Sequence, residues 1–263
     1  MLYSAPWFKE KRFVLKKSLL ILSICMFCLS ITAQESGAPE KGKESFEELD
    51  KLDQGTNLER KQYKNISENN KDRVINSIKL LTIVTANFGE DVPDSKSALE
   101  KIKKDYQIVL RYYYRRAYIA SGKAMVALEK DITTLLGKFA KSYDSKTQNL
   151  LAECADTITG QEQAQLVDTS TEGAKPVVPY REIAEAQQKL RIAYGQLGLA
   201  TDMTRDDRFY DAIVHYRIAK DYGIKILTDF KEQEADKKTI TDKYAKDLVD
   251  NKNQIAGTSQ NTK

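Results

Sequence analysis

Histidine and cysteine are scarce in this 263-residue sequence, which contains one histidine and three cysteines. Zinc sites need several such ligands at close spacing, and a serine–histidine–aspartate triad would depend wholly on His215. That residue lies in AIVHYRIAK beside Ile213 and Tyr216, a setting typical of a packing residue. The sequence also lacks a glycine-rich phosphate loop after a strand and the acidic spacing of a calcium loop. We therefore expect a protein that is not an enzyme, with no catalytic residue, no metal and no cofactor.

The first 33 residues have the layout of an export signal. An apolar run from Leu19 to Ile31 follows a basic stretch, and ITA before QES offers a cleavage site after Ala33. The run is short for a membrane-spanning helix, and the chain becomes strongly polar directly after it. We predict a cleaved signal peptide over residues 1–33 and no membrane contact after cleavage. Retention of this segment as an anchor is the alternative.

Only Cys154 would remain after cleavage, because Cys25 and Cys28 lie inside the signal. Neither of these two follows the small residue that a lipoprotein signal places before its acylated cysteine, so a lipoprotein is disfavoured. One thiol cannot form an internal disulfide, so the exported domain must depend on its core or its partners. Cys154 has apolar neighbours in NLLAECADTI, which predicts a buried small side chain. A reactive or intermolecularly bridged thiol is the alternative.

Net charge argues against a nucleic-acid partner. The predicted signal carries five basic residues and one acid, and the formal net charge of the whole chain is +4, so the rest of the chain is close to neutral. Proteins that bind nucleic acids keep a basic surface, because phosphate contacts supply most of their affinity. We expect no nucleic-acid partner, although a local basic patch could persist.

Signals for β-structure are also scarce. The sequence has five prolines and no Asn-Gly or Asp-Gly pair, whereas long stretches are rich in the helix-favouring residues Ala, Leu, Lys, Glu and Gln. The expected fold class is all-α, as an elongated bundle of long helices. Within it we expect a flexible or weakly helical polar arm over 34–56, a helical domain over 57–250 with a connector at 160–178, and a disordered tail over 251–263.

Apolar residues recur at spacings of three and four through two long stretches. The first predicts a helix over 57–88, ended by Gly89 and Pro93. The second runs without a break from Leu99 to Tyr143 and predicts a single helix of roughly 65 Å, at about 1.5 Å per residue. We expect this helix to continue to about residue 159. Pro179 is placed to begin the next helix.

The segment DDRFYDAIVHYRIAKDYG, residues 206–223, is similar to the second half of a tetratricopeptide repeat. Ala212, Tyr216 and Ala219 stand at the alanine–aromatic–alanine spacing of that repeat, with Phe209 three residues earlier. Its closing proline is replaced by Ile224, and no tandem copies follow. We therefore predict one tetratricopeptide-like helical hairpin in the C-terminal half, within another fold.

RYYYRRAY, residues 111–118, combines tyrosines with arginines in the middle of the second long stripe. On an unbroken helix Tyr113 would join the apolar seam, and the other aromatic and basic side chains would point elsewhere. Tyrosine and arginine are enriched in protein–protein contacts. The candidates for a protein interface are Arg111, Tyr112, Tyr114, Arg115, Arg116 and Tyr118. The alternatives are burial within the protein's own domain, a nucleic-acid grip and a membrane-interface belt.

Several stretches of the chain resemble the leptospiral (spirochaete) flagellar-coiling protein family, a component of the sheath around periplasmic flagella. These stretches are NLERKQYKNISENNKDRVINSIKLL, LLAECAD, KLRIAYGQL and RDDRFYDAIVHYRIAKDYGIKIL. The resemblance covers roughly residues 57–250 and is strongest between Arg205 and Leu227. It implies an elongated, bent, all-helical structural protein in the periplasm. Such a protein binds the filament core and other sheath proteins, and imposes the coiled filament shape that motility requires.

The residues themselves are compatible with a structural subunit that also associates laterally with its own copies, since a near-neutral surface lowers repulsion between packed copies. Two alternatives come from other classes. One is a periplasmic tetratricopeptide-like adaptor or assembly chaperone that binds protein partners with the hairpin at 183–227. The other is an envelope-bound protein that keeps its N-terminal segment.

Overall fold

The computed structural model describes residues 45–166 and 178–258, which form helices and short connections with no strand among them. The all-α fold class is therefore confirmed. By its contacts the chain divides into two units, Met1–Glu48 and Leu49–Lys263. In the first unit only residues 45–48 are described, and they include the start of α2 (Phe46–Leu52).

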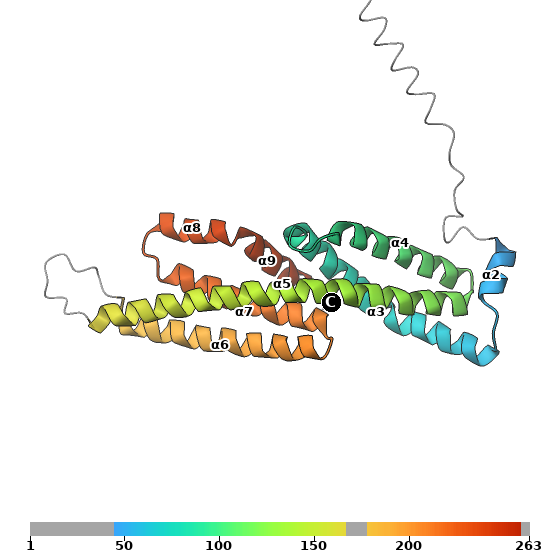
Figure 1. Ribbon diagram of the computed structural model, residues 1–263, viewed down its shortest axis with the longest axis horizontal. Coiled ribbons are helices and arrows are strands. Elements are labelled where there is room, and N and C mark those ends of the chain that lie inside the picture. Colours follow the sequence, from blue (N-terminus) through green and yellow to red (C-terminus); the bar gives the residue numbers. More distant parts are fainter. Residues whose placement is uncertain (1–44, 167–177, 259–263) are drawn as a thin grey trace, which may run out of the picture. The chain divides into compact units, whose positions relative to one another are not determined.

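The second unit begins with a bundle of three helices, namely α3 (Asn57–Phe88), α4 (Ser95–Tyr114) and the first half of α5 (Tyr118–Leu166). Two contacts for each pair of helices determine their directions. Arg73 and Ser67 on α3 contact Glu129 and Ser121 on α5, so the numbering rises together along α3 and α5. Lys101 on α4 pairs with Asp131 on α5, whereas the Val109 carbonyl on α4 accepts from Ser121 on α5, so the numbering runs in opposite directions along α4 and α5. Both α3 and α5 run antiparallel to α4 (Figure 1).

Local sequence explains where α3 begins. Thr56 and Glu59 form a capping box, in which the Glu59 N–H donates to the Thr56 hydroxyl at 3.2 Å and the Thr56 N–H donates to the Glu59 carboxylate at 2.8 Å. The helix then runs over the predicted range. Its apolar stripe enters the main core, whose fully buried members include Leu81, Val84 and, from α5, Phe139.

The second half of α5 forms a second three-helix bundle with α6 (Tyr180–Arg205) and α7 (Phe209–Asp229). Gln187 on α6 donates to Glu162 near the end of α5, and the Cys154 thiol on α5 donates to the Gly223 carbonyl on α7 at 3.2 Å. The α5 helix thus passes from one bundle into the other. In Figure 1, α3 and α4 lie along one half of α5, and α6 and α7 lie along the other half.

A third layer of α8 (Glu234–Lys243) and α9 (Ala245–Thr258) covers part of this arrangement, and polar contacts hold α9 in place. The fully buried Asp250 on α9 accepts from the guanidinium of Arg217 on α7, at 2.5 and 2.6 Å. Tyr143 on α5 also donates to Asp250. One turn earlier, Asp247 pairs with the buried Lys220, whose pKa is lowered by burial.

The long helix predicted from residue 99 onward is wrong, because the chain reverses at Arg115, Arg116 and Ala117 and forms an α4–α5 hairpin. Arg116 has φ 64°, in the left-handed region. Glycine or asparagine normally marks such a break, and neither is present here. The apolar stripe continues across the break, so hydrophobic periodicity alone could not reveal it.

Three predicted boundaries also differ from the structure. The described part of the polar arm, residues 45–56, contains α2, and Leu49 from it is buried. The α5 helix continues to Leu166, seven residues past its expected end. Helix α9 extends through Thr258 into the expected disordered tail. The predicted signal peptide 1–33, the arm over 34–44, most of the connector and the last five residues lie outside the described residues.

Candidate interaction site

The RYYYRRAY segment forms the turn between α4 and α5, which we call the basic turn (residues 115–117). The Arg116 N–H donates to the Tyr113 carbonyl and the Ala117 N–H donates to the Tyr112 carbonyl, both at 3.0 Å. These two bonds, together with the positive φ of Arg116, define a Schellman motif. Ala117 and Tyr112 also belong to the same small apolar cluster, the contact that usually accompanies this motif. The turn is therefore fixed in shape.

The six interface candidates divide by burial. Tyr114 is 70% exposed, and Arg115 and Arg116 are exposed at the turn itself. Arg111 and Tyr118 are partly buried. The inclusion of Tyr112 is wrong, because its side chain is only 8% exposed.

Tyr112 packs instead in a cluster with Leu49, Ala117 and Ala120. Tyr112 is buried because the chain reverses three residues later. Residues of α2 and of the start of α5 therefore cover a side chain that would be exposed on a straight helix. The expectation that Tyr113 joins the main seam is wrong for the same reason. Tyr113 is partly buried at the surface.

Neighbouring aromatic side chains support the exposed Tyr114. The ring of Tyr113 contacts those of Tyr114 and Tyr118 edge to face, with centroids 5.8 and 5.6 Å apart. The Tyr113 hydroxyl donates to the Glu68 carboxylate on α3 at 2.5 Å, and this bond, with a further contribution from burial, raises the pKa of Tyr113 to about 12. The basic turn thus presents one projecting tyrosine and two arginines on a braced support.

The turn between α6 and α7, which we call the acidic turn (residues 206–208), has the same backbone motif. The Asp207 N–H donates to the Thr204 carbonyl at 3.3 Å, and the Arg208 N–H donates to the Met203 carbonyl at 2.8 Å. Asp207 has φ 58°, close to the 64° of Arg116 at the matching position. Asp206 and Asp207 are exposed, as are the two arginines at the basic turn.

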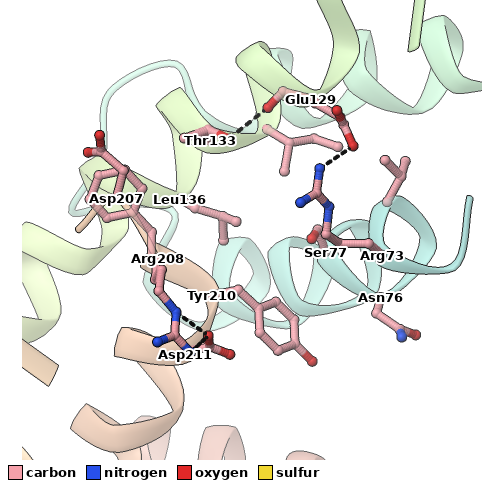
Figure 2. Close-up of a pocket in the computed structure, with 13 residues that line it drawn as sticks. Arg73, Asn76, Ser77, Glu129, Thr133, Leu136, Asp207, Arg208, Tyr210 and Asp211 are labelled. Carbon is pink, nitrogen blue, oxygen red and sulfur yellow. Dashed lines mark hydrogen bonds and ion pairs between the residues drawn. The ribbon is translucent and has the colours of Figure 1, made fainter. Parts of the chain in front are cut away.

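A cleft of about 410 Å³ lies beside the acidic turn, between α3, α5 and the start of α7 (Figure 2). Its lining consists of Arg73, Val74, Asn76, Ser77, Glu129, Ile132, Thr133, Leu136, Asp207, Arg208, Phe209, Tyr210 and Asp211. In Figure 2 the Arg73–Glu129 ion pair and the Arg208–Asp211 ion pair lie on opposite sides. The shortest N–O distances of the two pairs are 2.5 and 2.6 Å. Buried aliphatic side chains from α3 and α5 form the apolar part of the lining.

Sequence signals for this cleft were only partial. The acidic turn lies in TRDDRF, residues 204–209, and nothing in the spacing of this segment placed it against residues 73–77 and 129–136. Those three segments meet because α5 is shared by the two bundles, which is a consequence of tertiary packing. A matched pair of charged dipeptides between helical stretches was the one available clue.

The remaining individual predictions concern Cys154 and His215. Cys154 is buried, as predicted, and burial raises the pKa of its thiol to about 12. His215 is partly buried on α7, with its Nδ1 atom 2.7 Å from Oε1 of Gln196 on α6. This contact joins the two helices of the hairpin, which agrees with a packing residue.

Metal ions and membranes, as further ligands, would each need particular features among the described residues. Within 45–166 and 178–258, no three histidine, cysteine or acidic side chains gather closely enough to hold a metal ion. In the same part of the chain, no helix has the length and apolar character that a membrane span requires. Comparison with family models, with curated proteins and with solved structures finds no match to this chain.

The class of protein that the geometry supports is an all-α protein of two three-helix bundles joined by one long helix. Its prominent surface features are two rigid turns of opposite charge and a cleft. These features suit contact with other proteins, since tyrosine and arginine on a fixed backbone combine area, hydrogen bonding and low loss of conformational freedom.

Proposed function

We propose that this protein is a non-enzymatic structural subunit of the sheath around a periplasmic flagellar filament. In this role it binds the filament core and other sheath proteins after export, and helps to impose the filament's coiled shape. The observation that carries the proposal is the basic turn, where Tyr114 projects beside two arginines on a backbone held by a Schellman motif. The sequence resemblance to the flagellar-coiling proteins supplies the particular assembly.

The physical support is the combination of exposure with rigidity. The Tyr114 side chain is 70% exposed, so it buries little apolar area and adds little to the stability of the isolated chain. Its ring contacts the ring of Tyr113 edge to face, and the Tyr113 hydroxyl is tied to α3 through Glu68. A side chain held in this way loses little conformational entropy when a partner covers it. Such sites are typical of interaction hot spots.

Co-fractionation tests the proposal most directly. Periplasmic flagella are purified from the native organism, and the amount of this protein per filament is measured by quantitative mass spectrometry. The proposal predicts a stoichiometric amount on the filament, and loss of filament coiling when the gene is deleted. Recovery of the protein only in the free periplasmic fraction would contradict it.

Variants test whether the basic turn contacts the filament. Combined replacement of Tyr114, Arg115 and Arg116 by alanine should reduce the filament-bound fraction, whereas circular dichroism should remain unchanged because all three side chains are exposed. The matched control is Tyr180→Ala, which removes a tyrosine that is 77% exposed at the start of α6. Equal binding of both variants would exclude the basic turn as the contact. Tyr112 is left intact, since it belongs to the core.

One observation favours a second candidate function, a periplasmic tetratricopeptide-like adaptor. The cleft lies against the turn of the α6–α7 hairpin and has a volume within the range of ligand sites, about 300–1,000 Å³. An adaptor would form soluble, transient complexes through this cleft. The same fractionation separates the two functions, because an adaptor would be found free in the periplasm with substoichiometric partners.

A further inference from the structure

The two turns have surplus charges of opposite sign. Arg116 takes part in no ion pair within residues 45–166 and 178–258, and the same holds there for the Asp206 and Asp207 carboxylates. Nearby charged residues are satisfied locally, as in the Arg208–Asp211 and Arg205–Asp202 pairs. The cation of the basic turn and the carboxylates of the acidic turn therefore remain available to a partner.

The backbone makes these residue choices informative. Both Arg116 and Asp207 occupy the left-handed position of a Schellman motif, where glycine is the favoured residue. A side chain at this position strains the backbone, arginine more than aspartate. Strain that local structure does not require is often associated with a functional surface. The chain has a charged residue at the tip of each turn where glycine would be more stable.

Shape adds to charge. The cleft beside the acidic turn has an apolar lining from Val74, Ile132 and Leu136, with Asp207 at its edge. Its volume of about 410 Å³ is ample for one aromatic side chain and part of its flanking turn. Tyr114 projects next to Arg116, so one protruding element carries both an aromatic anchor and a cation. An aromatic anchor in a pocket with a charged rim is the usual composition of a hot spot.

We infer that the cleft receives the basic turn of a second copy of this chain, with Tyr114 in the cleft and Arg116 paired with Asp206 or Asp207. The inference rests on the proposed function as an assembly subunit and names one of its contacts. The two surfaces lie on different parts of the same unit, so each copy offers one turn and one cleft. A contact of this kind is heterologous, and repeated addition of copies produces an open chain.

A charge-exchange experiment tests the pairing. Wild-type exported protein and the single variants Arg116→Asp and Asp207→Arg are studied by analytical ultracentrifugation over a concentration series. The wild-type protein should self-associate. Each single variant alone should lose at least about tenfold in association affinity, because like charges then oppose each other at the contact. An equal mixture of the two variants should recover association, since each turn again meets a cleft of opposite charge.

Tyr114→Ala provides an independent measure of the anchor. Mixed with Asp207→Arg, it should give no long chains, because only one of the possible contacts retains both a tyrosine and a complementary charge. Arg205→Asp is the matched control, because this exposed arginine lies beside the acidic turn and pairs with Asp202 rather than lining the cleft. Circular dichroism of each variant verifies the fold, since all the substituted side chains are exposed.

Three results would overturn the inference. These are a wild-type protein that remains monomeric at every concentration, a mixture no more associated than its components, and self-association that is insensitive to Asp207→Arg. The last would mean that the contact between copies does not involve Asp207. Binding of each variant to isolated filaments is measured in parallel. If the protein binds filaments but does not self-associate, this inference is wrong and the proposed function still stands. If the wild-type protein does not bind filaments at all, both are wrong.

Discussion

The basic turn and the acidic turn join antiparallel helices through three residues each, with the same pair of closing hydrogen bonds and nearly the same φ at the middle residue. The basic turn has Arg115 and Arg116 where the acidic turn has Asp206 and Asp207. Backbone geometry therefore does not determine the charge of the turn. The opposite charges at equivalent positions are a property of the surface, and this makes them candidates for recognition.

The two bundles differ beneath the turns as well. The larger apolar core fills the α3–α4–α5 bundle and continues to Ala200 on α6 and to Ile213 and Tyr216 on α7. The α5–α6–α7 bundle has a smaller apolar cluster and, where α9 covers it, buried ion pairs around Asp250 and Lys220. A buried pair adds little net stability but fixes one arrangement, because each charge is costly without its partner. We infer that the polar contacts specify where α9 lies.

The largest expected effect is on this polar contact. Replacement of Asp250 by alanine leaves the Arg217 guanidinium buried without its carboxylate and removes the acceptor of the Tyr143 hydroxyl. Such a loss costs about 3–5 kcal/mol in the free energy of unfolding. Urea denaturation followed by circular dichroism measures it.

The control for this prediction is Lys246→Ala on the same helix. Lys246 pairs with Glu90 at 3.2 Å, but both side chains are largely exposed, so the expected loss is below about 1 kcal/mol. If both substitutions had equally small effects, α9 would not depend on its buried ion pair, and the contrast between the two bundles would be lost.

A second prediction compares close helix contacts in the two bundles. A Cβ atom on Gly122 would lie 2.8 Å from the backbone oxygen of Tyr63, whereas a Cβ atom on Gly223 would lie 2.9 Å from the side chain of Leu150. Because α3 must move as a whole in the first case, Gly122→Ala should cost about 1–3 kcal/mol in unfolding free energy. Gly223→Ala should cost less, since the Leu150 side chain can change its rotamer.

Thermal and urea unfolding of both variants provide the measurement, and Gly198→Ala is the control. Nothing lies within 4 Å of a Cβ atom at Gly198, so alanine should stabilise α6 by about 0.5–1 kcal/mol. A greater loss for Gly223→Ala than for Gly122→Ala would show that the helices of the second bundle are the more rigidly packed.

Much of the fold could be predicted from local signals. The α3 helix occupies its predicted range because a capping box and a glycine lie at its ends. Ala212, Tyr216 and Ala219 are buried in the helical hairpin, as their spacing indicates, although the relation to a tetratricopeptide repeat stays a prediction. These features depend on residues that are close together in the sequence.

The features that could not be predicted depend on distant residues or on unusual ones. The α4–α5 break is hidden because Arg116 occupies the place of a glycine. The helical domain was expected to end at residue 250, but α9 continues to Thr258, and its inward-facing residues, the partly buried Asp247 and the buried Asp250, are polar and break the apolar period. Their partners lie about thirty residues earlier on α7, and burial of an aspartate becomes favourable only when those cations are already in position.

A third prediction acts on the backbone of the two turns. Arg116→Gly relieves a left-handed φ of 64° and should raise the free energy of unfolding by about 0.5–1 kcal/mol. Asp207→Gly should gain less, because aspartate tolerates this region better than arginine does. Both variants should nevertheless weaken self-association, so stability and association would change in opposite directions.

The matched control for this prediction is Asp206→Gly, one residue earlier in the acidic turn. Asp206 has φ −89°, which suits any residue, so glycine there should lose about 0.5–1 kcal/mol through greater freedom of the unfolded chain. A gain in stability at position 206, or none at 116, would mean that the left-handed positions are not strained and would weaken the functional argument built on them.

The smallest predicted effect concerns the hydrogen bond from the Tyr113 hydroxyl to Glu68, which ties the basic turn to α3. The hydrogen bond to Glu68 raises the pKa of Tyr113 to about 12, from an ordinary value of 10.0. A raised pKa means that the folded state holds the proton more tightly than the unfolded state. The contribution of this bond to stability is therefore present below pH 10 and is lost as the pH rises towards 12.

Alkaline titration of tyrosinate absorbance measures this pKa, with Tyr113→Phe providing the difference spectrum that isolates one of the 14 tyrosines. Glu68→Gln removes the charged acceptor and should return the pKa of Tyr113 towards 10.0. Lys123→Gln is the control, because Lys123 lies 5.9 Å from the Tyr63 ring and no ion pair joins it to Glu68 among the described residues, whereas Lys64 pairs with Glu68 itself. If Glu68→Gln left the pKa unchanged, Tyr113 would not tie the basic turn to α3, and the rigidity argued for Tyr114 would depend on the Schellman motif alone.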